Sequence, residues 1–290
     1  MGENSDIAWT DHTFNPWWGC SKASPGCANC YAETFAKRTG QDRFGDKQRR
    51  LFGEKHWSEP VKWAKAARAS GKRAKVFCAS MGDVFEDRPE LVAPRILLSY
   101  LILDTADALD WLLLTKRPQN FALMPPGVLE KCWLGVTAED QARADERIPL
   151  LLQAPARVRF VSCEPLLGPV DLRQSRAIAL ERGVGAESGK PYPPLIDWII
   201  VGGESGPRAR PFDLSWARFI RSYCTDFGPR IFIKQLGRHA ISNDDDDRRH
   251  VGDMMLPHPF RLSFDDLDGR DPAEWPEDLR VQEFPRVESP

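Results

Sequence analysis

Six short apolar runs recur along this 290-residue chain, and each is followed at once by small, polar or acidic residues. Runs of about five residues, rich in β-branched and aromatic side chains, are typical of strands buried on both faces of a parallel sheet. The runs cover residues 75–79, 110–114, 132–136, 157–161, 197–201 and 230–233. This pattern limits the chain to a small set of sheet-centred folds.

The segments between the runs predict helices at 59–70, 89–108, 140–153 and 214–227. Alternation of strands and helices at this spacing is typical of βα units. With a first strand near 7–14, the chain has six or seven such units. We therefore predict an α/β fold, a partial or complete (β/α) barrel of six to seven parallel strands. A doubly wound open sheet is the alternative, because hydrophobic periodicity does not distinguish the two.

The expected barrel domain spans residues 1–237 and contains an inserted loop at 173–194, where Gly, Pro and charged residues are frequent. Residues 238–290 are expected to form a C-terminal extension that packs on the barrel. Within the extension, the acidic and basic run at 244–249 reads as a solvated loop. In (β/α) barrels the chemistry lies at the C-terminal ends of the strands, which is where the polar clusters of this chain fall.

Three cysteines, Cys20, Cys27 and Cys30, stand within eleven residues, in a loop shaped by Gly and Pro. Close thiolates are the usual ligands of iron–sulfur clusters and of zinc. Structural zinc normally takes four protein ligands, whereas three ligands leave one metal position open for a small molecule. His12 is a candidate fourth ligand, so zinc is retained as an alternative to a cluster.

Long motifs around and beyond these cysteines resemble the DUF5131 family, over about residues 6–281. The strings that carry the resemblance are TFNPWWGC, NCYAE, LLLTKRP, GVTAE, SCEPLLGP, WIIVGGESG and FIKQLG. Members of this family occur in bacteriophages and bacteria, and the family has been grouped with radical S-adenosylmethionine (SAM) proteins through its three cysteines. The first interval between the cysteines is longer here than in the commonest radical-SAM spacing.

The resemblance implies a [4Fe–4S] cluster on Cys20, Cys27 and Cys30, with SAM bound to the fourth iron. In radical-SAM enzymes, electron transfer cleaves SAM to a 5′-deoxyadenosyl radical that abstracts hydrogen from the substrate. Such an enzyme needs an electron donor such as flavodoxin or ferredoxin. The phage occurrence of the family suggests a nucleic acid or nucleotide as substrate, and a partner protein is a further expectation.

Two strand-end segments are the expected SAM contacts. Ser80, Gly82 and Asp83 stand where the superfamily has an element that contacts the SAM amino group; a tight turn with a helix-capping Asp explains them equally well. Gly202, Gly203 and Glu204 follow a later strand, and glycine permits close approach to the adenosine, although a structural turn is the default interpretation.

Charged residues end other strands and are candidates for binding or catalysis. Lys116, beside Arg117, can meet a carboxylate or phosphate, while a solvated strand end is the favoured interpretation for Arg117. Glu139 is a candidate for ribose hydroxyls and Glu164 for substrate, with salt bridges as the alternative for both. Lys234 is a candidate substrate or SAM-carboxylate contact. We take Lys116, Glu164 and Lys234 as the candidate catalytic residues.

Composition excludes some classes of function. The formal net charge of −2 provides no global basic field for nucleic acid, although 47–50 and 68–75 offer local basic patches. No stretch reaches the roughly 18 apolar residues of a membrane span, and the N-terminus does not resemble a secretory signal, so we expect a cytoplasmic protein without membrane contact. The other cysteines, Cys78, Cys132, Cys163 and Cys224, are expected to pack in the core, with Cys163 as the one candidate exception.

Two rival functions therefore stand beside the radical enzyme. One is a zinc- or cluster-stabilised nucleic-acid-binding protein without catalysis. The other is a cluster protein that acts on a partner as a scaffold or electron carrier. Acidic and basic residues at the strand ends favour an enzyme over both.

Overall fold

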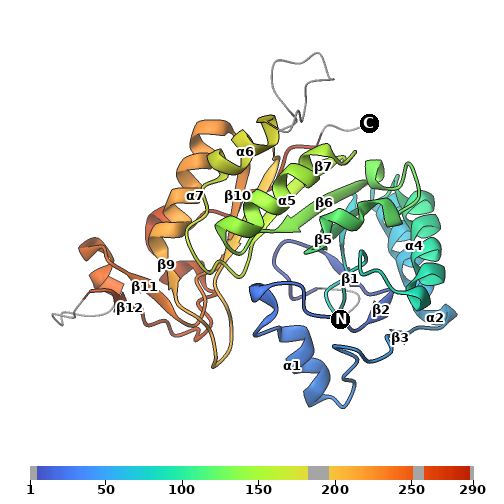
Figure 1. Cartoon of the computed structure of the whole chain (residues 1–290), viewed down its shortest axis with the longest axis horizontal. Helices are drawn as coiled ribbons and strands as arrows, with labels where there is room; N and C mark the ends of the chain where they lie inside the picture. The colour runs from blue at the N-terminus through green and yellow to red at the C-terminus, as the bar shows by residue number, and fades with distance from the viewer. Residues whose placement is uncertain (1–4, 182–195, 251–257, 288–290) are drawn as a thin grey trace. The chain divides into compact units, whose positions relative to one another are not determined.

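The fold is known from a computed structural model that describes residues 5–181, 196–250 and 258–287 (Figure 1). Its main sheet has seven strands in the order β1-β4-β5-β6-β7-β8-β10. They are β1 (His12–Phe14), β4 (Ala74–Cys78), β5 (Leu109–Thr115), β6 (Cys132–Thr137), β7 (Val158–Cys163), β8 (Trp198–Gly202) and β10 (Arg230–Gln235). This confirms the predicted α/β fold with six to seven parallel strands.

The strand order also decides between the two sheet types. The strands of this sheet lie side by side in the same order in which they occur along the chain, and β1 and β10 are the edge strands. A doubly wound sheet instead reverses its strand order at a switch point. The sequential order is that of a partial (β/α) barrel, and the doubly wound alternative is wrong.

Four main helices lie where the sequence predicts them, and their ends have local causes. α3 (Glu59–Ser70) ends at Gly71, which takes a left-handed conformation with φ of 67°. α7 (Leu214–Phe227) begins where the Asp213 carboxylate accepts a hydrogen bond from the Ser215 N–H, and it ends at a left-handed Gly228. The remaining helices are α1 (Tyr31–Arg38), α2 (Glu54–Trp57), α4 (Val92–Thr105), α5 (Gln141–Gln153) and α6 (Leu172–Glu181).

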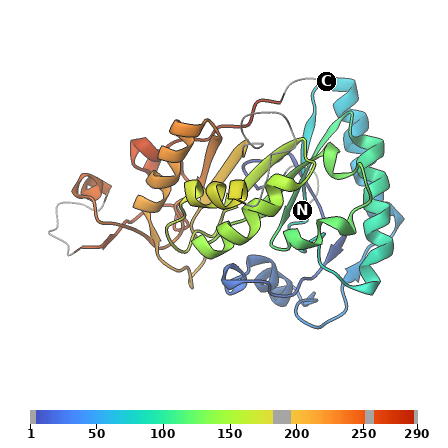
Figure 2. The ribbon, with the colours of Figure 1, turned by 45° about the horizontal axis from the view of Figure 1, so that its top comes forward.

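The chain divides into two compact units. The first comprises Met1–Val136 and Ala154–Arg159, and the second comprises Thr137–Gln153 and Phe160–Pro290. In the first unit, α3 packs against β4, β5 and α4 (Figure 2). The second unit carries a small additional sheet of β9 (Phe212–Asp213), β11 (Ala240–Ser242) and β12 (Phe260–Arg261). The predicted domain boundary at residue 237 stays a prediction.

The expected inserted loop at 173–194 is wrong in its first part, because residues Leu172–Glu181 form α6. Leu172, Ser175 and Ala179 are buried and recur at helical spacing along one face. The Gly and Pro content of the whole stretch concealed this short amphipathic pattern. Residues 182–195 lie outside the described part of the chain.

In the acidic run at 244–249, Asp244, Asp245 and Asp246 are exposed as expected, but Asp247 is only 2% exposed. Its carboxylate accepts hydrogen bonds from Ser242 Oγ at 2.5 Å and from the Arg218 guanidinium at 2.7 and 2.8 Å. The partner arginine lies on α7, 29 positions away in the chain. A local charge pattern could not reveal it.

Residues near the C-terminus pair with the free edge of β10. Ile233 N donates to Val281 O at 2.8 Å, and Glu283 N donates to Ile231 O at 2.8 Å. Pairing of this kind satisfies the backbone groups of an edge strand.

Replacing Glu283 with proline is expected to lower the free energy of unfolding by about 1–3 kcal/mol, because it leaves the buried Ile231 carbonyl without its donor. Equilibrium urea unfolding measures the change. Glu283→Ala is the matched control, since it keeps the backbone N–H, and it should unfold close to wild type. Equal unfolding of the two variants would show that the extension adds no stability through this pairing.

Candidate functional site

The three clustered cysteines lie in the first unit, in the segment between β2 (Trp17–Trp18), a short strand that comes soon after β1, and the start of α1. Cys27 ends a short 3-10 helix, Pro25–Cys27, and Cys30 is the N-terminal capping residue of α1. All three are free thiols with partly exposed side chains. Cys20 and Cys30 pack against one apolar cluster, which consists of Ala32, Ala36, Phe44 and Met81.

Two glycines allow this loop to lie against the end of β4. Gly19 N donates to Met81 O at 2.9 Å. Gly19 has a φ of +110°, and a Cβ there would stand 2.1 Å from Arg43 O. A Cβ on Gly82 would stand 3.2 Å from Gly19 O. The absence of a side chain at Gly82 therefore allows its backbone to lie close to that of Gly19. The role of Gly82 in binding SAM stays a prediction.

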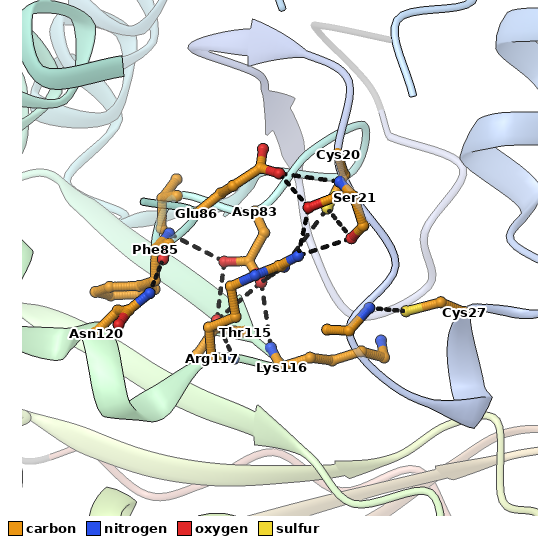
Figure 3. Close-up of polar contacts among 12 residues, drawn as sticks. Cys20, Ser21, Cys27, Asp83, Phe85, Glu86, Thr115, Lys116, Arg117 and Asn120 are labelled. Carbon is orange, nitrogen blue, oxygen red and sulfur yellow. Dashed lines mark hydrogen bonds and ion pairs between the residues drawn. The ribbon is translucent and has the colours of Figure 1, made fainter. Parts of the chain in front are cut away.

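The residue after the first cysteine is tied to a buried ion pair. Ser21 donates from its N–H, at 3.0 Å, and from its hydroxyl, at 2.6 Å, to the same Glu86 carboxylate oxygen (Figure 3). Arg49 grips this carboxylate from the other side, with Nε at 2.9 Å from Oε2 and Nη2 at 2.8 Å from Oε1. The side chains of Arg49 and Glu86 are 0% and 3% exposed. Bidentate pairs of this kind fix geometry, so the start of the cysteine loop is held rigidly.

Asp83, predicted to accept the SAM amino group, is buried at the end of β4. Its carboxylate accepts hydrogen bonds from Thr115 Oγ1 at 2.8 Å, Phe85 N at 3.0 Å and Arg117 Nη1 at 3.0 Å (Figure 3). Lys116 N adds a longer one, at 3.3 Å. In this conformation the carboxylate joins the ends of β4 and β5, and its role toward SAM stays a prediction.

Ser80, the other expected SAM contact of this segment, is nearly buried. Its hydroxyl accepts a hydrogen bond from Asn15 Nδ2 at 3.1 Å, and its carbonyl accepts one from the Tyr31 hydroxyl at 2.7 Å. Tyr31 is the first residue of α1 and follows Cys30 directly. The contacts of Ser80 therefore connect the end of the cysteine loop to the end of β4.

Two arginines that the sequence assigned to solvent are largely buried, which corrects those expectations. The Arg117 side chain is 12% exposed and pairs with Asp83. Arg49, from the expected basic patch at 47–50, is enclosed with Glu86. Each charge has a carboxylate partner supplied by a distant part of the chain. The second basic patch is also paired with acidic residues, as Arg68–Asp107 and Arg73–Asp110.

Each of the three sulfurs lies within reach of an N–H donor. Arg117 Nη1 lies 3.6 Å from Cys20 Sγ, and Ala23 N donates to Cys27 Sγ at 3.5 Å. Burial raises the pKa of Cys20 to about 12, with the Asp83 charge adding to the rise. Burial also raises the pKa of Cys30, opposed by the backbone N–H groups of Glu33 and Ala32 and by the charge of Lys116. The donors and the nearby positive charges offset only part of the effect of burial on these two pKa values.

The donor set fits an iron–sulfur cluster held by three thiolates. Hydrogen bonds to ligand sulfurs are a normal feature of such sites. Within the described residues, no three His, Cys, Asp or Glu side chains gather tightly enough to hold one metal ion. Cluster thiolates bind separate iron atoms, so they need not converge on a single centre. His12, the candidate fourth zinc ligand, stacks on Trp63 with ring centroids 4.5 Å apart.

A cavity of about 610 Å³ adjoins the Cys20 side of the loop. Its wall carries both signs of charge, since Lys22 and Lys37 pair with Glu33, and Lys47 pairs with Asp42. The pairing leaves the wall without a strong preference for anions or cations. The cavity gives small molecules access to one flank of the loop.

In the second unit, the candidates Glu164 and Lys234 form an ion pair at the ends of β7 and β10, with 2.5 Å between Oε1 and Nζ. Both side chains are partly exposed, at 17% and 26%. A Cβ on Gly202 would stand 3.4 Å from the Glu164 side chain. A Cβ on Gly203 would stand only 2.5 Å from Leu236 O, so this glycine serves backbone packing. Their roles toward substrate and SAM stay predictions.

The two remaining acidic candidates have arginine partners. Glu139 has no exposed side-chain surface and accepts a hydrogen bond from Arg147 Nη1 at 2.9 Å. Glu204, which is 9% exposed, accepts hydrogen bonds from Arg210 N at 2.9 Å and Arg210 Nη2 at 2.5 Å. In this structure Glu139 is therefore salt-bridged, which was the alternative interpretation of this residue. Cofactor roles for both residues stay predictions.

The four scattered cysteines lie in the core as predicted, and all are free thiols. Burial raises the pKa of Cys163, as it does those of Cys78, Cys132 and Cys224. Cys163 has no exposed surface, so it packs in the core like the other three and is not the candidate exception.

Comparison with known proteins gives a family and one distant fold neighbour. A solved structure of a spore photoproduct lyase double mutant, with bound AdoMet and dinucleoside spore photoproduct, matches with a TM-score of 0.48 and 10% identity. The match covers 70% of this chain and 58% of that one. No curated protein sequence matches significantly. The model of the family DUF5131, described as a protein of unknown function, matches residues 4–270. The chain belongs to the DUF5131 family.

Proposed function

We propose that this protein is an iron–sulfur, SAM-dependent radical enzyme whose cluster is held by Cys20, Cys27 and Cys30. One observation carries the proposal. Three free thiols share the loop after the first strand of a parallel sheet, and N–H donors lie beside all three sulfurs. This is the place at which radical-SAM proteins carry their cluster, as the family resemblance implies.

A bound cluster would supply the electron that cleaves SAM, and the protein's own part is to bind, orient and exclude water. The Ser21–Glu86–Arg49 contacts hold the first ligand segment, so that the thiols are arranged before any metal arrives. Ser80, Gly82 and Asp83 remain the proposed SAM-binding segment of the first unit. In the second unit, Glu139 and residues 202–204 are also proposed to bind SAM.

Lys116, Glu164 and Lys234 are the proposed substrate-side groups. Lys116 is supported by its place directly after β5, where its backbone N–H donates to Asp83 at 3.3 Å. Glu164 and Lys234 are supported by their partial exposure at strand ends, since a partly exposed ion pair can exchange its partner for a charged substrate.

We propose a nucleic acid or nucleotide substrate from the family resemblance, together with a flavodoxin- or ferredoxin-like electron donor. A nucleic-acid-binding protein without catalysis is less favoured, because Arg49, Arg68 and Arg73 of the two basic patches are paired with carboxylates. In the described residues no helix is both long and apolar enough to cross a membrane. Seven free cysteines suit a reducing compartment, so we propose the cytoplasm.

The test is anaerobic purification, reconstitution with iron and sulfide, and electron paramagnetic resonance (EPR) of the reduced protein with and without SAM. We expect a [4Fe–4S]⁺ signal that SAM perturbs. Cys27→Ala should abolish the signal, since two thiolates do not retain the cluster. Cys224→Ala, which removes a core thiol, is the matched control and should keep it. Bound zinc without a cluster, or a cluster indifferent to SAM, would refute the radical-SAM proposal.

A further inference from the structure

One guanidinium group connects the end of β5 to the first cysteine of the loop. Arg117 Nη2 donates to the Ser21 carbonyl at 2.7 Å and to the Ser21 hydroxyl at 3.1 Å. Its Nη1 lies 3.0 Å from Asp83 Oδ2 and 3.6 Å from Cys20 Sγ (Figure 3). The same planar fork therefore contacts a carboxylate, a backbone carbonyl and a sulfur.

The position of the Arg117 side chain is fixed by its ion pair with the buried Asp83. Asp83, its ion-pair partner, is 5% exposed and also accepts hydrogen bonds from Thr115 Oγ1 and Phe85 N. The side chain of Arg117 is itself 12% exposed. A charge held this way keeps its direction, and water screens it only weakly.

The three sulfurs differ in the charge of their donors. Cys27 Sγ accepts from the backbone N–H of Ala23, and Cys30 accepts from backbone N–H groups at the start of α1. Cys20 instead faces a charged guanidinium at 3.6 Å, whose ion-pair partner Asp83 offsets part of the charge. Reduction adds an electron to a cluster, and a nearby positive charge favours the more negative state. Local charge and hydrogen bonds to sulfur are established determinants of cluster potential.

We propose that Arg117 is a positioning residue that orients Cys20 for ligation and raises the reduction potential of the cluster held by the three cysteines. This inference rests on the proposed function, because it requires a cluster on these thiols. It deepens that proposal because the Asp83–Arg117 pair, which joins the strand ends to the loop, would then also tune the cluster.

The experiment is an EPR-monitored redox titration of the reconstituted protein, with iron content measured alongside. Arg117→Gln removes the charge, and we expect its midpoint potential to fall by an amount equal to about a tenfold change in the reduction equilibrium, about 59 mV for one electron. Arg88→Gln is the matched control. Arg88 pairs with Glu90 and is also a partly buried arginine of the first unit. It should leave the potential unchanged.

A second variant keeps the inference testable if Arg117→Gln does not fold. Arg117→Lys retains the charge but not the fork, so we expect lower iron content with a smaller fall in potential. A wild-type potential in Arg117→Gln, or, where only Arg117→Lys folds, a wild-type iron content in that variant, would overturn the inference while leaving the cluster assignment intact. Absence of any cluster in the wild-type protein would overturn both, and that outcome is seen before any variant is compared.

Discussion

Arg49→Met is expected to lower the free energy of unfolding by about 3–5 kcal/mol, because it leaves the buried Glu86 carboxylate without its ion-pair partner. The guanidinium makes five contacts in all. Besides Glu86, it donates to the carbonyls of Arg43 at 2.8 Å, Lys47 at 2.5 Å and Gly45 at 2.9 Å. Methionine fills much of the same volume but satisfies none of these acceptors. The variant should also retain less iron after reconstitution, since Glu86 holds Ser21 beside the first cysteine.

Equilibrium urea unfolding followed by circular dichroism measures the stability loss, and iron content measures the effect on the loop. Arg50→Met is the matched control. Arg50 is the next residue, is only half-buried and contacts Gln41 and Trp18, so a loss below about 1 kcal/mol is expected. Adding Glu86→Gln to Arg49→Met should recover part of the stability, because the unpaired charge is then gone. Wild-type unfolding of Arg49→Met would contradict the buried pair.

Gly19→Ala should disrupt the cysteine loop more than any other single methyl group added there. The added Cβ would meet the Arg43 carbonyl oxygen at 2.1 Å, where the backbone φ of +110° already disfavours a side chain. The loop must shift away from the Arg43 backbone, which we expect to cost at least about 2 kcal/mol and most of the iron bound on reconstitution.

Gly45→Ala separates the steric clash from the backbone strain, which are the two causes of the expected effect of Gly19→Ala. Gly45 also has a positive φ, of +69°, but a Cβ there meets nothing within 4 Å. Its cost should be limited to backbone strain, about 1 kcal/mol, with iron content near wild type. Unfolding and iron assays on the two variants, side by side, test the close approach. Similar results for both would show that the loop does not depend on it.

Most of the fold could be predicted from the sequence because its signals are local. The apolar runs predict the strands, and residues such as Gly71, Asp213 and Gly228 mark helix ends through backbone conformation or capping. The prediction failed at 172–181, where a short helix shares its surroundings with Gly and Pro. There the average composition of the segment outweighed the spacing of its buried residues.

Of the candidate site, only the three cysteines could be predicted. Cysteine spacing located the three thiols, whereas the side chains that hold the loop were missed. Arg49 and Glu86 are 37 positions apart, and Ser21 and Arg117 are 96 apart. Pairing over such distances leaves no local pattern, and a buried arginine looks like a solvated one in a sequence. One signal was available, because parallel strands bring the C-terminal ends of β1, β4 and β5 to the same side of the sheet.

The ion pairs around Ser21 also bear on whether the protein folds before or after it binds a metal. A zinc finger folds only as it takes up its metal, because its ligands are otherwise unrestrained. Here the segment carrying Cys20 is held by Arg49, Glu86 and Arg117, all of which are present in the bare polypeptide. The proposed cluster would therefore be inserted into a protein that is already folded around Cys20. Its loss would leave a folded apoprotein that can be reloaded instead of being degraded.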